Sequence, residues 1–265
     1  MYAPFQLARK YVWYVMTALN GKGHGVHSPF VFDFITHILN DTTKYAYFDT
    51  IEALRGKLLQ DMRMIDVEDF GAGSATMSAR NRRIRDIARV SLKNKKFAQL
   101  LYRIVRYYQP RSLIELGTSL GITTSYIAAA NRAAMVHTLE GSNNIAKIAR
   151  DNFQQIGLDN VHLTVGNFDE TLPRLLAGVD AIDFAFVDGN HRRQPTLEYF
   201  SALRAKSVPS SILIFDDIHW SEEMEEAWKQ IRGHESVTLT IDLFFIGIVF
   251  FRPDFKVKQH FTIRF

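Results

Sequence analysis

Two acidic residues, Glu115 and Glu140, have the neighbours needed to bind a ligand that contains a nucleoside. Glu115 lies inside the apolar run 113–116, which stops at Gly117 and Gly121 before a helical pattern begins. A strand that passes into a helix through glycines presents backbone N–H groups at the positive end of the helix dipole, and glycines let a ligand approach closely. Glu140 ends the next apolar run, where a carboxylate can accept both hydroxyls of a ribose. The pair predicts a nucleoside-containing cofactor.

A second group of acids follows two later apolar runs. Asp188 comes after the first of these runs, and Asp216 and Asp217 come after the second. The carboxyl ends of neighbouring parallel strands meet at one edge of a sheet, so these carboxylates should lie close together. Like charges so close repel unless a cation offsets them or one takes a proton. All-oxygen ligands suit Mg²⁺, Mn²⁺ or Ca²⁺, whereas the alternative is that one acid only caps the following helix.

A histidine near these acids has the chemistry of a general base. His191 lies three residues after Asp188, and an unperturbed imidazole titrates near neutral pH. The alternative is a surface histidine in a polar loop. His219, just after Asp217, is a second candidate base, and Trp220 would give it an aromatic wall.

Alternating helical and strand patterns position these residues. Helices are predicted over 97–108, 123–130, 142–156, 169–177, 194–205 and 221–232, and strands over 112–116, 135–140, 161–165, 182–187, 211–215, 236–242 and 244–251. Strands that alternate with helices indicate a parallel sheet covered on both faces. The last two strands are too close for a crossover helix and should pair antiparallel. The sequence predicts a mostly parallel, seven-stranded α/β sheet that ends in an antiparallel hairpin.

The first 94 residues have a different pattern. Helices are expected over 5–19, 30–39 and 49–62, and the glycine-rich linker 21–29 contains His24 and His27, which we expect to shape its turn. We interpret residues 1–94 as a helical extension or lid on a domain of residues 95–265. The segment Asp66–Ser74 is a rival acid-and-glycine motif. No buried strand precedes it and no apolar helix follows, so we interpret it as a loop that could close as a lid.

Composition limits the class of protein. The chain has 265 residues, 47% apolar content and no cysteine, which indicates a globular protein without disulfides or cysteine-bound metals, in a reducing compartment. It has no apolar run of about 18 residues and no signal-peptide pattern, so the expected location is cytoplasmic and no membrane partner is expected. The net charge of +4 permits an anionic partner without requiring one.

Basic residues gather between positions 80 and 96. They are Arg80, Arg82, Arg83, Arg85, Arg89, Lys93, Lys95 and Lys96. Such runs most often form the solvated face of a helix, which is the interpretation we favour. The alternative is a surface for phosphate groups or nucleic acid, but aromatic residues do not alternate with these charges.

In this order and spacing, the motifs resemble those of class I S-adenosylmethionine-dependent methyltransferases. The branch with catechol O-methyltransferase-like and sugar O-methyltransferase-like enzymes is the more similar one, over roughly residues 95–251. The resemblance is carried by Glu115-Leu116-Gly117-Thr118-Ser119-Leu120-Gly121, Glu140, Gly166-Asn167-Phe168, Phe186-Val187-Asp188-Gly189-Asn190-His191 and Phe215-Asp216-Asp217. Two departures are Pro209-Ser210-Ser211, where Pro-Gly-Gly is usual, and Asn167, where aspartate is more common.

The resemblance implies a role for each matching residue. The methionine end of the cofactor would be held by Glu115, Gly117, Thr118, Ser119 and Gly121, the ribose by Glu140 with Gly141, and the adenine by Asn167 and Phe168. Asp188 would contact the cofactor and act with His191 in catalysis, and Asp188, Asp216 and Asp217 would bind a divalent cation such as Mg²⁺. Residues 24–30, His-Gly-Val-His-Ser-Pro-Phe, resemble extensions of uncharacterised bacterial members and imply no substrate.

The resemblance implies O-methylation of a small-molecule or sugar-like hydroxyl, with or without metal assistance, by an enzyme that could be a homodimer. One alternative keeps the chemistry but makes RNA the acceptor, using the basic run 80–96. A second is an NAD-dependent oxidoreductase, although the Gly-x-Gly-x-x-Gly motif expected there is missing. A third is a module that binds the cofactor without catalysis.

Overall fold

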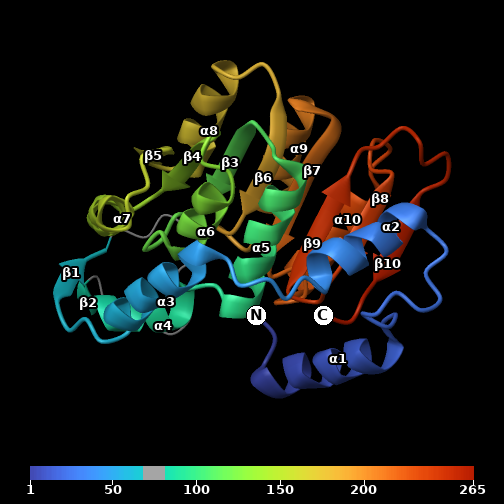
Figure 1. The fold of residues 1–265 in the computed structure, drawn as a ribbon, viewed down its shortest axis with the longest axis horizontal. Helices are drawn as coiled ribbons and strands as arrows, with labels where there is room; N and C mark the ends of the chain where they lie inside the picture. The colour runs from blue at the N-terminus through green and yellow to red at the C-terminus, as the bar shows by residue number, and fades with distance from the viewer. Residues whose placement is uncertain (68–80) are drawn as a thin grey trace. The chain divides into compact units, whose positions relative to one another are not determined.

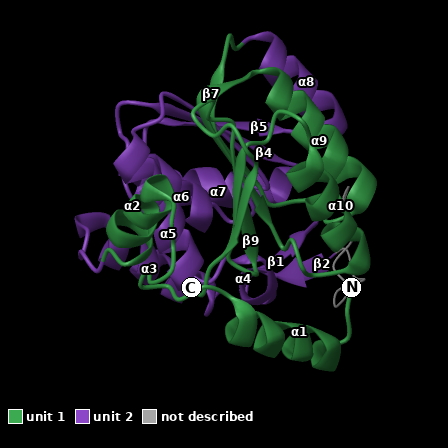
Figure 2. Cartoon of the chain, turned by 90° about the vertical axis from the view of Figure 1, so that its right-hand side faces the viewer, with its two compact units in different colours: residues 1–41, 179–265 green, residues 42–178 purple. Residues whose placement is uncertain are grey.

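The structure, a computed structural model, describes residues 1–67 and 81–265. The chain forms two compact units (Figure 2): unit 1 combines Met1–Asp41 with Val179–Phe265, and unit 2 is Thr42–Gly178. The N-terminal 94 residues are therefore divided between the two units, whereas the sequence led us to treat them as one extension. The expected domain boundary after residue 94 stays a prediction.

Unit 2 holds three parallel strands in the order β3-β4-β5. Figure 1 shows these strands with their connecting helices. In chain order the elements are α3 (Ala46–Leu58), β1 (Met64–Asp66), β2 (Asn81–Arg83), α4 (Ile84–Ser91), α5 (Lys95–Tyr108), β3 (Ser112–Leu116), α6 (Ile122–Ala130), β4 (Met135–Glu140), α7 (Asn143–Gln155), β5 (Val161–Val165) and α8 (Phe168–Ala177).

Local sequence explains where these elements begin and end. Tyr108 is the last residue of α5, because Gln109 takes a left-handed conformation (φ 48°) and Pro110 follows it. Asn94 caps the start of α5 through its side chain, which accepts the Lys96 N–H at 2.9 Å. The apolar run of β3 is buried, as expected for a central strand of a parallel sheet.

Part of the N-terminal region packs into unit 2. Helix α3 lies against α6, where the ring of Phe48 meets that of Tyr126 edge-on at 5.4 Å. The Tyr126 hydroxyl donates to Glu52 at 2.8 Å. Strands β1 and β2 pair antiparallel, a small hairpin that the sequence did not predict. Since α3 supplies buried side chains to this core, we do not expect residues 95–265 to fold alone.

Unit 1 holds five strands in the order β10-β8-β9-β7-β6. Its elements are α1 (Pro4–Thr17), α2 (Pro29–Phe34), the π-helical turn η1 (Ile35–Leu39), β6 (Ile182–Val187), α9 (Arg193–Ala205), β7 (Ser207–Asp216), α10 (Glu222–Gly233), β8 (Leu239–Asp242), β9 (Ile246–Phe250) and β10 (Gln259–Thr262). β6 and β7 are parallel, and β9 is antiparallel to both β7 and β8.

The mostly parallel α/β sheet and the antiparallel β8–β9 pair are confirmed, but the expected number of strands is wrong. The sheet has eight strands rather than seven. The extra strand, β10, runs parallel to β8 with His260 opposite Thr240. It has only four residues, none of them fully buried, so no alternating apolar pattern marks it in the sequence.

Helix α1 packs on the C-terminal part of unit 1. Tyr14 and Ala18 are buried against Phe244, with Leu7 and Val15 at the margin of this cluster. The Tyr14 hydroxyl donates to the carbonyl of Ile263, and Leu19 pairs with that residue as an isolated bridge. Within the described part of the chain, no helix is long and apolar enough to cross a membrane.

Candidate functional site

The loop after β3 turns through three residues with positive φ. These are Gly117 (101°), Ser119 (48°) and Gly121 (81°). A Cβ on Gly121 would lie 2.6 Å from the Phe153 ring, so glycine is needed there for the packing of α6 on α7. Ser119 has no such freedom, and a serine held in this region is backbone strain of the kind that gathers at functional sites.

The N–H groups of this loop are already bonded, contrary to the expectation that they would be available to a ligand. Gly117 and Thr118 both donate to the Leu139 carbonyl, at 3.0 and 3.1 Å. Ser119 donates to the Glu140 carboxylate at 2.9 Å. These hydrogen bonds hold the loop against the end of β4. The groups that could bind a ligand here are therefore the neighbouring carboxylates rather than these amides.

Glu140 connects two loops through its carboxylate. Oε2 accepts the Ser119 N–H and Oε1 accepts the Ser142 N–H, each at 2.9 Å. A carboxylate has about four acceptor positions, and these two amides take two of them. Gly141, between Glu140 and Ser142, is half-buried. The Glu140 side chain is thus held at the tip of β4, where the predicted ribose contact would be made.

Glu115 is fully buried inside β3. Its Oε2 accepts hydrogen bonds from Thr124 at 2.5 Å and Thr138 at 2.6 Å, whereas Oε1 has no hydrogen-bond partner. Burial raises the pKa of this carboxyl to about 7 against the effect of the two threonines, and the charge of Glu140 raises it further. A cation placed beside Oε1 would satisfy the atom and favour the ionised form.

Asn167 and Phe168 begin α8 at the end of β5. The Asn167 side chain accepts the Asp169 N–H at 3.2 Å, so it serves as a helix cap. Both residues are half-buried, and Gly166 before them donates to the Glu140 carbonyl at 2.9 Å. The cap accounts for the asparagine without a ligand, and Phe168 is the better candidate for contact with a flat base.

Register brings the predicted cofactor residues to one edge of unit 2. Leu116 pairs with Leu139 across β3 and β4, and Glu140 pairs with Val165 across β4 and β5. The strands are parallel, so the loops that follow them lie together. Two contacts add residues from the N-terminal region: the Ser91 hydroxyl is 2.8 Å from that of Ser119, and Asn144 donates to the Asp66 carbonyl.

The predicted catalytic pair belongs to unit 1. Asp188 follows β6, and its Oδ1 lies 3.6 Å from Nε2 of His191. The His191 ring also packs against Trp220, with ring centroids 5.7 Å apart. The carboxylate on Nε2 leaves Nδ1 as the nitrogen that could accept a substrate proton. The structure therefore joins His191, Asp188 and Trp220, although the sequence had placed Trp220 beside His219.

The predicted metal ligands come from the ends of β6 and β7. Residues 1–67 and 81–265 contain no group of three or more histidine, cysteine, aspartate or glutamate side chains placed to hold an ion. Asp188 and Asp216 end neighbouring parallel strands, but Asp217 has φ 54° and begins a turn whose carbonyl accepts the Trp220 N–H. A divalent cation at Asp188, Asp216 and Asp217 stays a prediction from the sequence.

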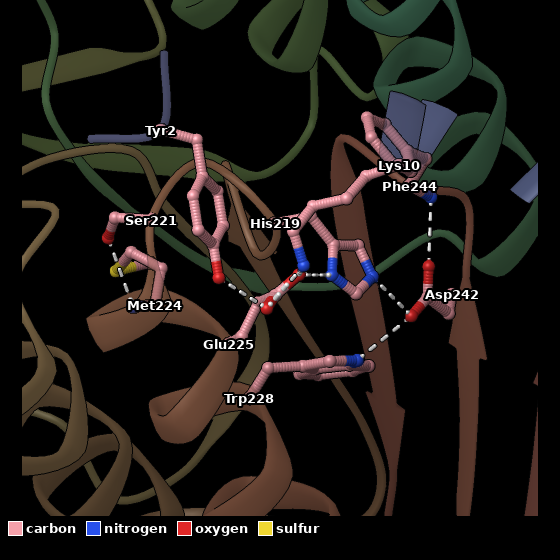
Figure 3. A network of polar contacts seen from close by, with 9 residues as sticks. All are labelled: Tyr2, Lys10, His219, Ser221, Met224, Glu225, Trp228, Asp242 and Phe244. Atoms are coloured by element: carbon pink, nitrogen blue, oxygen red, sulfur yellow. Dashed lines mark hydrogen bonds and ion pairs between the residues drawn. The ribbon is translucent and has the colours of Figure 1, made fainter. Parts of the chain in front are cut away.

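His219 is held between two carboxylates, as Figure 3 shows. Nδ1 lies 3.0 Å from Glu225 Oε1, and Nε2 lies 2.9 Å from Asp242 Oδ2. Burial lowers the pKa of His219, but the hydrogen bonds and charges of Asp242 and Glu225 outweigh it and raise the pKa overall. Carboxylates engage both ring nitrogens of His219, so the structure favours His191 over His219 as the candidate base.

The same network includes residues that sequence reasoning missed. Trp228 donates to Asp242 at 3.1 Å, and Tyr2, just before α1, and Lys10 of α1 donate to Glu225 at 2.8 and 3.0 Å. The pKa of Glu225 is lowered, because these partners and His219 outweigh its burial. In the sequence, His219 and Glu225 are six residues apart. Neither a regular helix nor a regular strand brings residues at that spacing into contact, so the sequence did not predict this pair.

Three further predictions concern the basic run, the two histidines of the glycine-rich turn and the rival glycine motif. In α4, Ile84, Ile87 and Ala88 are buried while Arg89 is exposed, which agrees with a solvated basic face. His24 and His27 are exposed, and backbone bonds shape their turn. Asp66 ends β1, but the rest of the rival glycine motif lies almost wholly outside the described residues, as does Arg80.

Comparison with known proteins agrees with this geometry. Residues 114–218 match a family model described as "Methyltransferase domain". The match covers 105 of the 265 residues of the chain. The match begins within β3 and ends just beyond β7, so it includes every predicted cofactor and catalytic residue. Among curated proteins, none matches this chain.

Several solved structures of methyltransferases have a fold similar to that of this chain. An O-methyltransferase from Bacillus cereus in complex with S-adenosylhomocysteine has a TM-score of 0.57 at 18% identity, over 79% of this chain and 92% of its own. O-methyltransferase TomG from Streptomyces achromogenes, involved in tomaymycin synthesis and bound to S-adenosylmethionine, has 0.54 at 20%, over 61% and 82%. The S-adenosylhomocysteine-bound methyltransferase PaMTH1 of Podospora anserina has 0.55 at 14%, over 80% and 99%. The resemblance to class I methyltransferases is confirmed.

The histidine network predicts a pH dependence of stability. Because the folded-state pKa of His219 is raised, its contribution to the free energy of unfolding is complete below the unfolded-state pKa of about 6.5 and is lost as pH rises through the folded-state pKa. His219→Gln should cost ~2 kcal/mol at pH 6, since hydrogen bonds to charged groups are lost, and clearly less at pH 9. Urea unfolding at both pH values measures this.

His137→Gln is the matched control for that measurement. Burial and the neighbouring His162 lower the pKa of His137, so its contribution has the opposite pH dependence. A cost for His219→Gln that is equal at pH 6 and pH 9 would show that the imidazole is not charged in the folded protein.

Proposed function

We propose that this protein is a methyltransferase that uses S-adenosylmethionine and transfers a methyl group to a hydroxyl of a small-molecule or sugar-like acceptor. The observation that carries the proposal is the Glu140 carboxylate, fixed at the end of β4 by the amides of Ser119 and Ser142. The matched methyltransferase domain and the cofactor-bound structures of similar fold support the same cofactor.

Two carboxylates test whether the residues fit this cofactor. Glu115 has a buried oxygen without a partner, which a cationic amino group would satisfy. Glu140 is anionic and faces the loop that begins α6, where ribose hydroxyls could donate to it. Both fit the polar ends of S-adenosylmethionine, so we assign Glu115 to the amino group, Glu140 to the ribose and Phe168 to the adenine. Gly117, Thr118, Ser119, Gly121, Gly141 and Asn167 support these contacts through the backbone of their loops.

The chemistry requires a proton acceptor from the protein. The cofactor supplies a methyl carbon on a cationic sulfur, and the acceptor hydroxyl must lose its proton as it attacks. We assign this proton to Nδ1 of His191, while Asp188 at Nε2 orients the ring and stabilises the imidazolium that results. Trp220 packs on the same ring and limits its rotation. The base thus works without a metal ligand in this proposal.

The alternatives become outcomes of the experiments. An RNA acceptor would need the basic face of α4, whose Arg85 and Arg89 lie 3.4 and 3.9 Å from Asp86. An oxidoreductase would bind NAD. A module without catalysis would bind S-adenosylmethionine and turn over no acceptor.

Cofactor binding should depend on Glu140. S-adenosylhomocysteine should raise the unfolding temperature of the wild-type protein, and NAD should not, because a ligand of the folded state stabilises it. Glu140→Gln should weaken S-adenosylhomocysteine binding at least tenfold by calorimetry, since charge-assisted bonds are worth about 1.5–3 kcal/mol each. Glu170→Gln, on the exposed first turn of α8, is the matched control and should bind normally. Unchanged affinity in Glu140→Gln would move the cofactor elsewhere.

Binding should also release protons near pH 7 through Glu115. Its pKa of about 7 means that the carboxyl is partly protonated in the empty protein, and a cationic amino group beside it lowers the pKa. The binding enthalpy of S-adenosylhomocysteine should therefore differ between phosphate and Tris buffers by an amount that shows proton release. Glu115→Gln should abolish the difference. If the variant keeps it, another group releases the proton.

His191→Ala should slow transfer without weakening the cofactor. Loss of a general base should lower kcat by ~10²–10⁴ for an acceptor identified from a panel of catechols, phenols and sugars. The acidic limb of the pH–rate profile should disappear, while S-adenosylhomocysteine affinity stays within twofold. Activity equal to that of the wild type would remove His191 from the mechanism and leave the cofactor assignment intact.

A further inference from the structure

Helix α1 has apolar side chains on two opposite faces. One face holds Tyr14, Ala18, Leu7 and Val15, which pack against the Phe244–Phe245 region of unit 1. A helix that is apolar on both sides is normally buried on both. Figure 2 shows α1 at the edge of unit 1, so its second face needs an explanation.

That second face carries large exposed side chains at helical spacing. Phe5 is 78% exposed, Val12 55%, Trp13 66% and Met16 71%. Positions 5, 9, 12, 13 and 16 fall on one side of a helix, so Arg9 lies in the middle of this exposed face. A contiguous exposed patch of this kind, with tryptophan and phenylalanine, marks an interaction site.

The charge of the segment indicates what could cover this face. Residues 1–32 contain no aspartate or glutamate, and the first acid is Asp33. Lys10 points to the other side, where it pairs with Glu225 at 3.0 Å. Arg9 is exposed, and no ion pair is found for it among residues 1–67 and 81–265. The partner must therefore offer both an apolar layer and a negative charge beside it.

A second copy of the chain meets only the first requirement. A twofold interface brings the same surface of both copies together, so Arg9 would approach its own equivalent. Without an acid in residues 1–32, the two guanidinium groups would be enclosed by apolar side chains without a counter-charge from this segment, which is costly. A bilayer surface with anionic headgroups meets both requirements.

We propose that α1 is an interfacial helix that docks on anionic lipid surfaces. Phe5, Val12, Trp13 and Met16 enter the boundary between headgroups and acyl chains, and the aliphatic stem of Arg9 lies among them while its guanidinium contacts a lipid phosphate. Tryptophan is favoured at this depth of a bilayer. This surface binding differs from the expected absence of a membrane partner, which considered only segments long enough to span.

The packed face holds α1 ready for such docking. The Tyr2 and Lys10 side chains bond to Glu225, the Tyr2 N–H donates to the Trp220 carbonyl at 3.0 Å, and the Tyr14 hydroxyl bonds to the Ile263 carbonyl. The helix is formed and attached before it meets lipid, so binding does not have to order it. The proposal goes beyond methyl transfer and is independent of it.

Vesicle flotation with the full-length protein tests the proposal. Vesicles of phosphatidylcholine with about 30% phosphatidylglycerol should bind the protein at least tenfold more tightly than vesicles of phosphatidylcholine alone. Trp13→Ser should weaken this binding at least tenfold. Arg9→Gln should weaken it about fivefold, the fold-change for about 1 kcal/mol per basic residue at an anionic surface. Tryptophan emission should shift to shorter wavelength when the wild-type protein binds, and this shift should be absent in Trp13→Ser.

Controls separate the outcomes. Val257→Ser removes an equally exposed apolar side chain outside α1 and should leave vesicle binding unchanged. The unfolding temperatures of all variants should match the wild type, since the substituted side chains are exposed. Absence of binding to anionic vesicles would overturn the proposal. So would a dimer in sedimentation that Trp13→Ser dissociates, because a second copy would then cover this face.

Discussion

The Glu140 carboxylate is the constraint on which the candidate cofactor site depends. It accepts the amide of Ser119 from the loop after β3 and the amide of Ser142 at the start of α7. Its own carbonyl accepts the Gly166 N–H from the end of β5. One residue therefore joins the ends of three parallel strands. A site at this edge is formed before any ligand arrives, and the ligand meets a carboxylate whose position is fixed.

Glu115 shows the opposite use of a carboxylate. Two threonine hydroxyls satisfy one oxygen, and burial keeps the pKa of the group near 7, so the empty site can hold it neutral. The two acids lie on neighbouring strands, but Glu115 has one oxygen without a partner, whereas both oxygens of Glu140 accept backbone amides. A cationic group beside Glu115 would favour its ionised form, and the Glu140 carboxylate is held in place to accept hydrogen bonds from neutral hydroxyls.

The sequence predicted the parallel core well because each core strand is a short apolar run with glycine, proline or polar residues at its ends. The predicted strands 112–116, 135–140, 161–165 and 182–187 coincide with β3, β4, β5 and β6. β10 was missed because three half-buried residues and one exposed residue form no alternating apolar pattern, and the β1–β2 hairpin was missed because its strands have three residues each. The predicted cofactor residues that follow β3, β4 and β5 lie at one edge of unit 2, but the amides expected to contact a ligand bond to β4 instead.

The sequence could not show which polar residues of the N-terminal and C-terminal parts of unit 1 bond to one another. His219 looked like a base because it follows two aspartates, yet its ring is bound by Glu225 and Asp242, which come from α10 and the end of β8. Tyr2 and Lys10 reach the same Glu225 from more than 200 positions away, which no local pattern can encode. The Tyr2 N–H also bonds to the carbonyl of Trp220, whose ring packs on His191. Within unit 1, therefore, the residues that lead into the helix with the exposed apolar face are joined by a hydrogen bond to the loop beside the candidate base.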